Sequence, residues 1–213
     1  MRADRKVILA LDETDPVKAK AIAKVVAPYV AAVKVNYPLA LSAGLGIVAE
    51  LAKDSYVLCD FKVADIPNTN RLIVEQAIKA GASGVICHAF TGEDSVKACV
   101  EAARGKDIFV VTEMSHPGGK RFTQPLADEL AKIAVEAGAA GVIAPATRPE
   151  RIAHVRKLVG TLKILSPGVG AQGGSAGDAL RAGADYVIVG RSIYQSPDPS
   201  DAAKAIFEET KSL

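Results

Sequence analysis

The stretch Ala80-Gly81-Ala82-Ser83-Gly84-Val85-Ile86 recurs in similar form at two later places in the chain. The matching stretches are 137–143 and 182–188, and each joins an Ala-rich helical pattern to a short apolar run. Glycine at a helix end can take the left-handed conformation that stops the helix, so each stretch predicts a helix end, a tight turn and a strand. The chain therefore repeats a helix-to-strand unit.

On both sides of these stretches, β-branched runs alternate with helical patterns along the whole chain. Strands are expected at Val7–Leu11, Ala32–Val35, Tyr56–Phe61, Gly84–Cys87, Ile108–Thr112, Gly141–Ala144, Lys163–Leu165 and Tyr186–Val189. Helices are expected at Pro16–Ala27, Asn70–Ala80, Ser95–Arg104, Leu126–Ala137, Glu150–Leu158, Gly177–Ala182 and Ser200–Thr210. Strands that are almost continuously hydrophobic indicate a parallel sheet covered on both faces. Their count and the chain length favour a single-domain α/β fold, a closed (β/α)₈ TIM barrel over residues 1–213.

The composition excludes several classes of function. The 26 basic and 24 acidic residues nearly balance, and no basic cluster interleaves with aromatic residues, so nucleic-acid binding is not expected. The N-terminus lacks a signal-like apolar segment, and no apolar run approaches the ~18 residues of a membrane span. Cys59, Cys87 and Cys99 show no C-x-x-C pairing, and Cys59 and Cys87 lie in apolar strands, so a reducing cytoplasm is the expected location.

Polar residues gather where the predicted strands end. The residues at these ends are Asp12, Lys34, Asp60 with Lys62, His88, Thr112 to Ser115, Pro145, Ser166 to Gly168, and Gly190 with Arg191. Active sites of such barrels lie at the C-terminal ends of the strands, so this pattern predicts an enzyme.

The charged residues follow the third strand in the stretch Asp60-Phe61-Lys62-Val63-Ala64-Asp65. Side chains two apart on a strand share a face, so Asp60 and Lys62 should project together, and Asp65 is able to fold back toward them. With Lys34 they form an alternating chain of charges, which would hold Lys62 as an ammonium group ready to deliver a proton. A salt-bridge network that caps the barrel mouth is the structural alternative.

A Gly-rich loop, Ser166–Gly174, follows the seventh strand, and Gly190-Arg191-Ser192 follows the eighth. Barrels often bind phosphate with these two loops, and Arg191 adds a bidentate charge partner. A mobile loop beside a surface arginine is the alternative, but both segments fall where a phosphate site is expected.

The long connection after the fifth strand, Glu113–Phe122, is typical of a lid, with Ser115 placed to hydrogen-bond a planar polar ligand. The alternative for Ser115 is a hydroxyl that only stabilises the loop. His88, His116 and His154 show no metal-ligand spacing, so zinc is not expected. Asp12 could bind sugar hydroxyls, although Asp is also common at helix starts.

These motifs, in this order, resemble the orotidine 5′-phosphate decarboxylase family in its short, single-function microbial form. The stretch Asp60–Thr69 resembles the family signature, Ser166–Gly174 its phosphate and pyrimidine loop, and Thr112–Gly118 the start of its lid. Gly190–Tyr194 matches the end of its eighth strand, and the similarity spans essentially the whole chain. The resemblance implies a cofactor-free, metal-free decarboxylation of orotidine 5′-phosphate to UMP, the last step of de novo pyrimidine nucleotide synthesis.

The resemblance also implies roles for single residues. Lys62 would protonate C6 as carbon dioxide leaves, Asp60 would lie against the substrate carboxylate, and Lys34 and Asp65 would complete the charged group. A homodimer is implied, in which Asp65 and Thr69 reach the partner subunit's site. The implied substrate-binding residues are Asp12 and Lys34 at the ribose, Ser115 and Gln172 at the pyrimidine, Gly190 and Arg191 at the phosphate, and Asp60, Thr69, Pro167, Gly168 and Gly173 around them.

Two other functions are open. A related barrel decarboxylase or aldolase for sugar phosphates, such as 3-keto-gulonate 6-phosphate decarboxylase, shares the Asp-x-Lys-x-x-Asp pattern but is expected to hold magnesium. The pair Ser115 and Gln172, suited to a pyrimidine, argues against it. A non-catalytic nucleotide-binding barrel would keep Arg191 and the Gly-rich loop but lose the charged group, which is intact.

Overall fold

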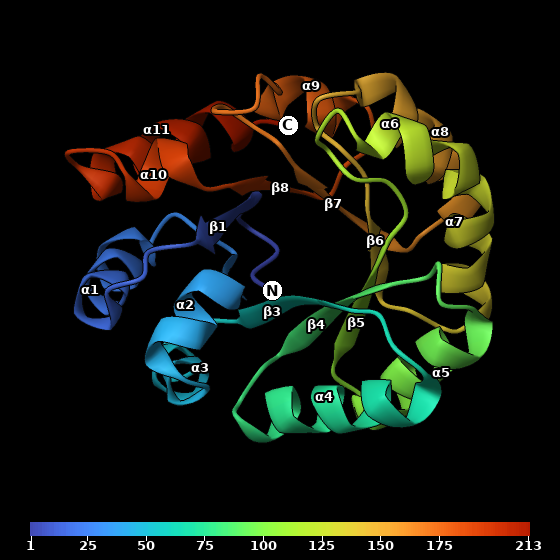
Figure 1. Ribbon diagram of the computed structural model, residues 1–213. Helices are drawn as coiled ribbons and strands as arrows, with labels where there is room; N and C mark the ends of the chain where they lie inside the picture. Colours follow the sequence, from blue (N-terminus) through green and yellow to red (C-terminus); the bar gives the residue numbers. More distant parts are fainter.

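Eight parallel strands close into a barrel in the computed structural model, which describes residues 1–213 (Figure 1). Each strand pairs with its successor in the chain, and the last pairs with the first. The strands are β1 (Val7–Leu11), β2 (Ala32–Asn36), β3 (Val57–Val63), β4 (Gly84–His88), β5 (Asp107–Val111), β6 (Gly141–Ile143), β7 (Lys163–Pro167) and β8 (Tyr186–Val189). The predicted α/β barrel is confirmed.

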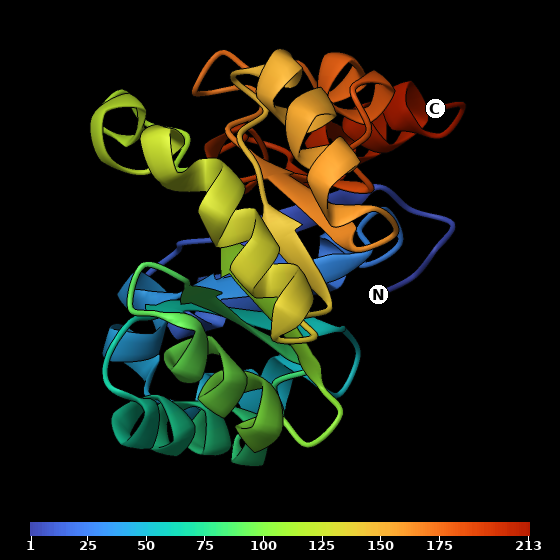
Figure 2. The same ribbon diagram turned by 90° about the vertical axis from the view of Figure 1, so that its right-hand side faces the viewer.

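Helices surround the barrel on the outside, and the segment that contains α6 projects from one end of it (Figure 2). The helices are α1 (Pro16–Val26), α2 (Tyr37–Ala43), α3 (Gly46–Leu51), α4 (Pro67–Lys79), α5 (Glu93–Ala102), α6 (Gly119–Phe122), α7 (Ala127–Glu136), α8 (Pro149–Val159), α9 (Ala176–Arg181), α10 (Arg191–Tyr194) and α11 (Pro199–Thr210), with a 3-10 turn, η1 (Gln124–Leu126). The seven predicted helices are all present, with ends that differ by at most three residues. None of the helices combines the length and hydrophobicity that crossing a membrane requires.

The repeated glycine stretch ends its helices as expected. Gly81 has a φ of +104°, its N–H donates to the carbonyl of Ile78 over 2.9 Å, and the N–H of Ala82 reaches back to the carbonyl of Ala77 over 3.1 Å. These two bonds form a Schellman ending, and the same pair of bonds closes α7 and α9. The left-handed glycine thus turns the chain directly into the following strand.

The core has two layers because side chains alternate along each strand. A cluster of 48 buried residues fills the space between the barrel and the helices, and a separate cluster of 12 fills the barrel interior. Along β1, for example, Val7 and Leu9 belong to the outer cluster, whereas Ile8 and Ala10 belong to the inner one. Inward-facing positions at the C-terminal strand ends are therefore free to carry polar groups into the barrel mouth.

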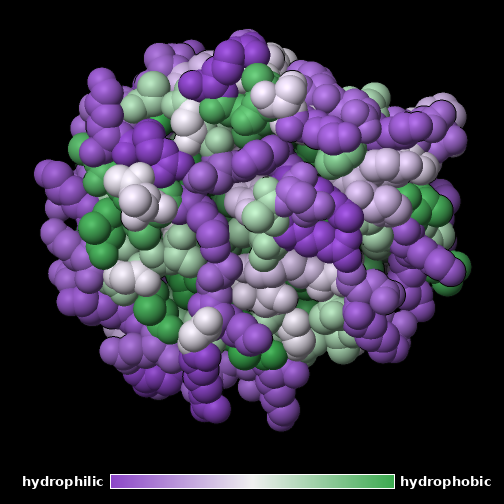
Figure 3. All heavy atoms as spheres, turned by 180° about the vertical axis from the view of Figure 1, so that it is seen from behind, coloured by the Kyte–Doolittle hydropathy of each residue, from purple (hydrophilic) through white to green (hydrophobic).

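Four short helices, α2, α3, α6 and α10, were not among the predictions. In α2 and α3 a proline and two glycines (Pro38, Gly44 and Gly46) break the segment after β2 into pieces too short for a clear helical period. The other two, α6 and α10, have only four residues each. The face opposite the view of Figure 1 is largely hydrophilic, with hydrophobic side chains in scattered patches (Figure 3).

Candidate active site

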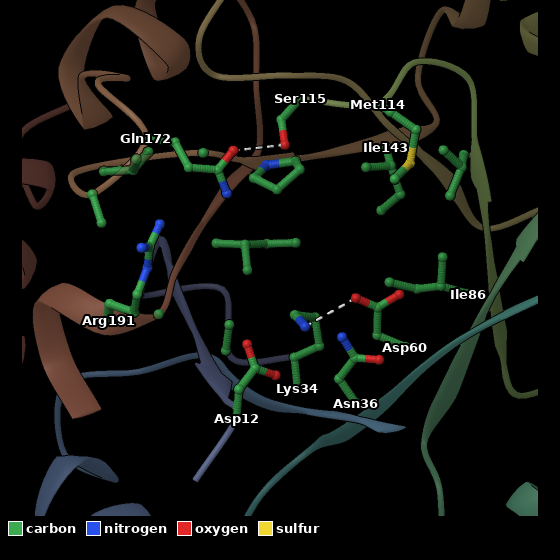
Figure 4. A pocket seen from close by; sticks show the side chains of 18 of the residues that line it. Asp12, Lys34, Asn36, Asp60, Ile86, Met114, Ser115, Ile143, Gln172 and Arg191 are labelled. Carbon is green, nitrogen blue, oxygen red and sulfur yellow. Dashed lines mark hydrogen bonds and ion pairs between the residues drawn. The ribbon is translucent and has the colours of Figure 1, made fainter. Parts of the chain in front are cut away.

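A cavity of about 250 Å³ lies at the C-terminal end of the barrel and is lined from the ends of all eight strands. Its apolar base is formed by Ala10, Ile86, Val111, Ile143 and Ile188, which all belong to the inner core cluster. The remaining lining is largely polar, and Figure 4 shows these side chains around the central space. The cavity combines a hydrophobic base with charged and polar walls.

Asp60 lies between two lysines on one side of this cavity. Its Oδ1 is 2.7 Å from the Nζ of Lys62, and its Oδ2 is 2.9 Å from the Nζ of Lys34. The side chains of Asp60 and Lys34 are only 8% and 6% exposed. Burial by itself would raise the pKa of Asp60, but the two lysines outweigh burial and hold that pKa below its usual range. The structure therefore brings Lys34, Asp60 and Lys62 together as an alternating charged group.

Lys62 has an unusual backbone. Its φ is +42°, in the left-handed region that residues with a side chain rarely adopt. The pairing of β3 with β4 shifts register at the same place, between Cys59 and Val63. A left-handed non-glycine residue costs about 1–3 kcal/mol, and such strain is typical of functional sites. The bulge carries Lys62 into the cavity beside Asp60.

Asp65 and Thr69 do not line the cavity of their own chain. The exposed carboxylate of Asp65 accepts a hydrogen bond from the N–H of Ile66 over 2.7 Å and forms no ion pair with Lys62. The backbone of Asp65 is held firmly, because its N–H donates to Asn70 and its carbonyl accepts from the hydroxyl of Ser95, both over 2.9 Å. The expected fold-back of Asp65 toward Lys62 within one chain is thus absent.

The two segments predicted to bind phosphate lie across the cavity from Asp60. Gly168 has a φ of +103°, and the loop after it closes on itself through a bond from the N–H of Gly174 to the carbonyl of Gly168. Arg191 begins α10, is exposed, and pairs with no acidic side chain. Figure 4 places Arg191 and Asp60 on opposite sides of the space. Gly190 and Pro167 also line the cavity, whereas Gly173 does not.

The side chains of Ser115 and Gln172 connect the long loop after β5 to the Gly-rich loop after β7. The hydroxyl of Ser115, in the loop after β5, donates to the Oε1 of Gln172, in the loop after β7, over 2.9 Å (Figure 4). Both side chains line the cavity between Arg191 and Asp60. A planar polar ligand in the cavity would meet this pair at its edge.

A buried ion cluster that was not predicted anchors the loop after β5. Glu113 is fully buried, with one carboxylate oxygen 2.8 Å from the Nε of Arg148 and the other 2.9 Å from the Nε of Arg151. Arg148 also donates to the carbonyl of Met114 over 2.6 Å. Because Arg148 and Arg151 lie 35 and 38 residues beyond Glu113, no local pattern reports this contact.

Three further polar residues occupy strand ends. Asp12 lines the cavity, and its Oδ1 is buried without a hydrogen-bond partner. Asn36, which was not predicted, also lines it, and its position two residues after Lys34 on β2 is the signal that would have found it. His88 lies outside the lining, and burial together with Lys62 lowers its pKa to about 4.

The chain is similar to known proteins over nearly its whole length. The model of the orotidine 5′-phosphate decarboxylase / HUMPS family matches residues 5–206. Orotidine 5′-phosphate decarboxylases from Methanococcoides burtonii and Thermococcus kodakarensis are 58% and 53% identical to the chain, covering 98% and 97% of it and 99% and 97% of their own lengths.

The solved structures that the chain resembles are the same enzyme as the sequence relatives. The orotidine 5′-monophosphate decarboxylase of Methanocaldococcus jannaschii, complexed with the inhibitor BMP, has a TM-score of 0.92 and 46% identity, over 96% of this chain and 97% of that one. The orotidine 5′-phosphate decarboxylase of Pyrococcus horikoshii has a TM-score of 0.91 and 48% identity, over 97% and 100%.

Proposed function

Because this chain belongs to the orotidine 5′-phosphate decarboxylase / HUMPS family, we propose that it converts orotidine 5′-phosphate to UMP and carbon dioxide, with Lys62 as proton donor to C6. It is then a carboxy-lyase of pyrimidine nucleotide synthesis. The observation that carries the proposal is the buried Asp60 carboxylate held between Lys34 and Lys62 at one side of the cavity, with Arg191 at the other.

The two sides of the cavity suit the two charged ends of this substrate. The phosphate would bind at Arg191, Gly190 and the loop that begins at Pro167, because guanidinium and backbone N–H groups favour phosphate oxygens. The substrate carboxylate would then lie near Asp60 and Lys62. Ser115 and Gln172 lie between these ends and would bind the pyrimidine edge.

Asp12 and Lys34 would bind the ribose hydroxyls. The Oδ1 of Asp12 is buried and has no hydrogen-bond partner in the protein, which is costly for a carboxylate oxygen. A ribose hydroxyl that donates to this oxygen would satisfy it. Lys34 lines the same cavity and keeps donor capacity beyond its contact with Asp60, because an ammonium group has three N–H donors.

Lys62 would complete the chemistry. When the bond from C6 to the carboxylate breaks, the electron pair stays on C6 and carbon dioxide leaves. The ammonium group of Lys62 stabilises that negative charge and transfers a proton to C6, so that Lys62 becomes neutral and UMP forms. The charged group thereby supplies both the electrostatic stabilisation and the proton, and the proposed reaction needs neither a metal ion nor an organic cofactor.

We further propose a homodimer in which Asp65 and Thr69 enter the partner subunit's site. Support comes from the surface around Asp65, where large apolar side chains are exposed. Leu41 is 81%, Ile66 65% and Phe90 58% exposed, and they lie on α2 and just after β3 and β4, which are neighbours in the barrel. Exposed apolar side chains that gather in this way are typical of an interaction surface.

A spectrophotometric assay with orotidine 5′-phosphate, run with and without EDTA, tests the proposal. We expect loss of the substrate absorbance with release of carbon dioxide, and no effect of EDTA. Turnover that vanishes with EDTA would instead favour a metal-dependent sugar-phosphate type of barrel. Tight binding of UMP without any release of carbon dioxide would favour a non-catalytic nucleotide-binding protein.

A further inference from the structure

The carbonyl of Phe61 lies where β3 loses its strand partners. The pairing of β2 with β3 ends at Asn36 opposite Asp60, and the pairing of β3 with β4 is interrupted between Cys59 and Val63. A carbonyl at this position has no regular place in either ladder, and an unpaired polar group that is partly buried is unfavourable. Something outside the sheet must satisfy it.

Tyr37 satisfies this carbonyl. It is the residue after Asn36, the last residue of β2, and its hydroxyl donates a hydrogen bond of 2.6 Å to the carbonyl oxygen of Phe61. The two rings also stack, with centroids 5.4 Å apart and planes 21° from parallel. Phe61 is therefore held through both its side chain and its backbone by a residue from the neighbouring strand end.

The held peptide directly precedes Lys62. The carbonyl of Phe61 belongs to the peptide unit that sets the φ of Lys62, and that φ is +42°. The other left-handed residue that is not glycine, Arg104, precedes Gly105 in an exposed turn, whereas Lys62 lies within a strand. A strained residue persists only where its surroundings fix it.

The hydroxyl of Tyr37 is a dependable donor. Burial, and the negative charge of Asp60 nearby, raise the pKa of Tyr37, so the phenol keeps its proton throughout the range in which an enzyme works. The hydrogen bond from the Tyr37 hydroxyl to the carbonyl of Phe61 is therefore present throughout this pH range.

We propose that Tyr37 is a positioning residue for Lys62. By holding the Phe61 carbonyl, its hydroxyl keeps Lys62 in the left-handed conformation that brings the Lys62 ammonium group 2.7 Å from Asp60 and into the cavity. Tyr37 is not among the cavity-lining residues, so it acts through the backbone of β3. This inference rests on the proposed function, because it explains what fixes the position of Lys62, the proposed proton donor.

The variant Tyr37→Phe tests the proposal, because it removes the hydroxyl and keeps the stacking ring. We expect kcat for orotidine 5′-phosphate to fall by about tenfold to a hundredfold, the usual effect of losing one well-placed hydrogen bond from a catalytic unit. KM should change by no more than about twofold, since the phosphate grip at Arg191 is untouched.

Tyr56→Phe is the matched control. The hydroxyl of Tyr56 also makes a hydrogen bond of 2.6 Å, to the carboxylate of Asp107, but it does so at the N-terminal end of the barrel. We expect this variant to lose thermal stability with an unchanged kcat. Because Tyr37 is 46% exposed near the proposed subunit contact, kinetics are measured at concentrations where wild type and variants sediment as the same species.

A crystal structure of Tyr37→Phe supplies a readout that needs no turnover. We expect Lys62 to leave the left-handed region and its Nζ to move out of contact with Asp60. An unchanged kcat, or a Lys62 that keeps both its φ and its contact with Asp60, overturns the proposal. Absence of activity in the wild-type protein would refute only the proposed function, since the geometry of Lys62 is read independently of substrate.

Discussion

Lys62 reaches Asp60 over 2.7 Å from a left-handed backbone, although the two residues share one strand. On a regular strand their side chains would merely point to the same face. The bulge in β3 instead brings the ammonium and the carboxylate into direct contact while Asp60 keeps its second oxygen for Lys34. The ammonium group of Lys62, the proposed proton donor, is therefore already in contact with its nearest counter-charge in the protein without substrate.

Replacing Lys62 by alanine is expected to reduce kcat at least about 10³-fold, because both the proton and the positive charge at C6 are lost. Asp60 keeps its bond to Lys34, so the fold should survive and UMP should still bind within about tenfold of wild type. Single-turnover absorbance and calorimetric titration with UMP measure the two effects. Turnover near the wild-type level would refute Lys62 as proton donor.

Mixing two inactive variants tests the shared site. If Asp65 serves the partner subunit, a heterodimer of Lys62→Ala and Asp65→Ala has one doubly damaged site and one intact site. Random reassociation should then restore about a quarter of the wild-type activity, since half the dimers are mixed and each has one working site. If Asp65 served its own chain, every site would be damaged, and the mixture would stay inactive.

Arg191→Ala is expected to raise KM for orotidine 5′-phosphate by about 10²-fold or more, because a bidentate charged contact to phosphate is lost. Arg191→Lys should recover only part of this loss, since lysine keeps the charge without the planar fork. Steady-state kinetics on both variants provide the check. Kinetics equal to wild type in the alanine variant would remove Arg191 from the phosphate site.

Arg148→Ala should destabilise the protein by about 3–5 kcal/mol, because it leaves the fully buried Glu113 with one of its two partners. Arg181→Ala is the matched control: that arginine pairs with Asp178 on the surface, where a salt bridge is worth about 0–1 kcal/mol. Urea unfolding gives both values. Equal stabilities of the two variants would show that Glu113 does not depend on Arg148.

His88 should make stability depend on pH. Burial and Lys62 lower its pKa to about 4 from an ordinary 6.5, so between these values the unfolded chain binds a proton that the folded chain does not. Stability from this group is complete above pH 6.5 and is lost as the pH falls toward 4. Since the ring is partly solvated, we expect about 1–2 kcal/mol. His88→Gln should flatten this part of the curve; an unaltered slope would contradict the assignment.

The sequence predicted the framework and the polar strand ends well. Periodic apolar runs and the recurring glycine turns are local, so strands and helices could be placed within a few residues. Asp12, Lys34, Asp60, Lys62 and Arg191 were found because the barrel rule says where strand ends point, and all five line the cavity.

What the sequence could not give depends on contacts between distant segments. Glu113 meets Arg148 and Arg151 only after β5 and β6 pair, so its burial has no local signature. The left-handed φ of Lys62 runs against the intrinsic preference of lysine and coincides with the bulge in β3 and with the hydrogen bond from Tyr37 to the carbonyl of Phe61. Conformational propensities describe single residues, whereas the burial of Glu113 and the backbone conformation of Lys62 depend on contacts between distant residues.

The elements around the rim of the closed barrel fall into two groups. The exposed apolar residues and Asp65 belong to the side formed by β2, β3 and β4, whereas the glycine loop, Gly190 and Arg191 belong to β7 and β8. In the proposed homodimer, the subunit contact and the opening beside the phosphate-binding segments would therefore lie on different halves of one rim. In such a dimer, substrate would enter and product would leave beside the glycine loop without separation of the subunits.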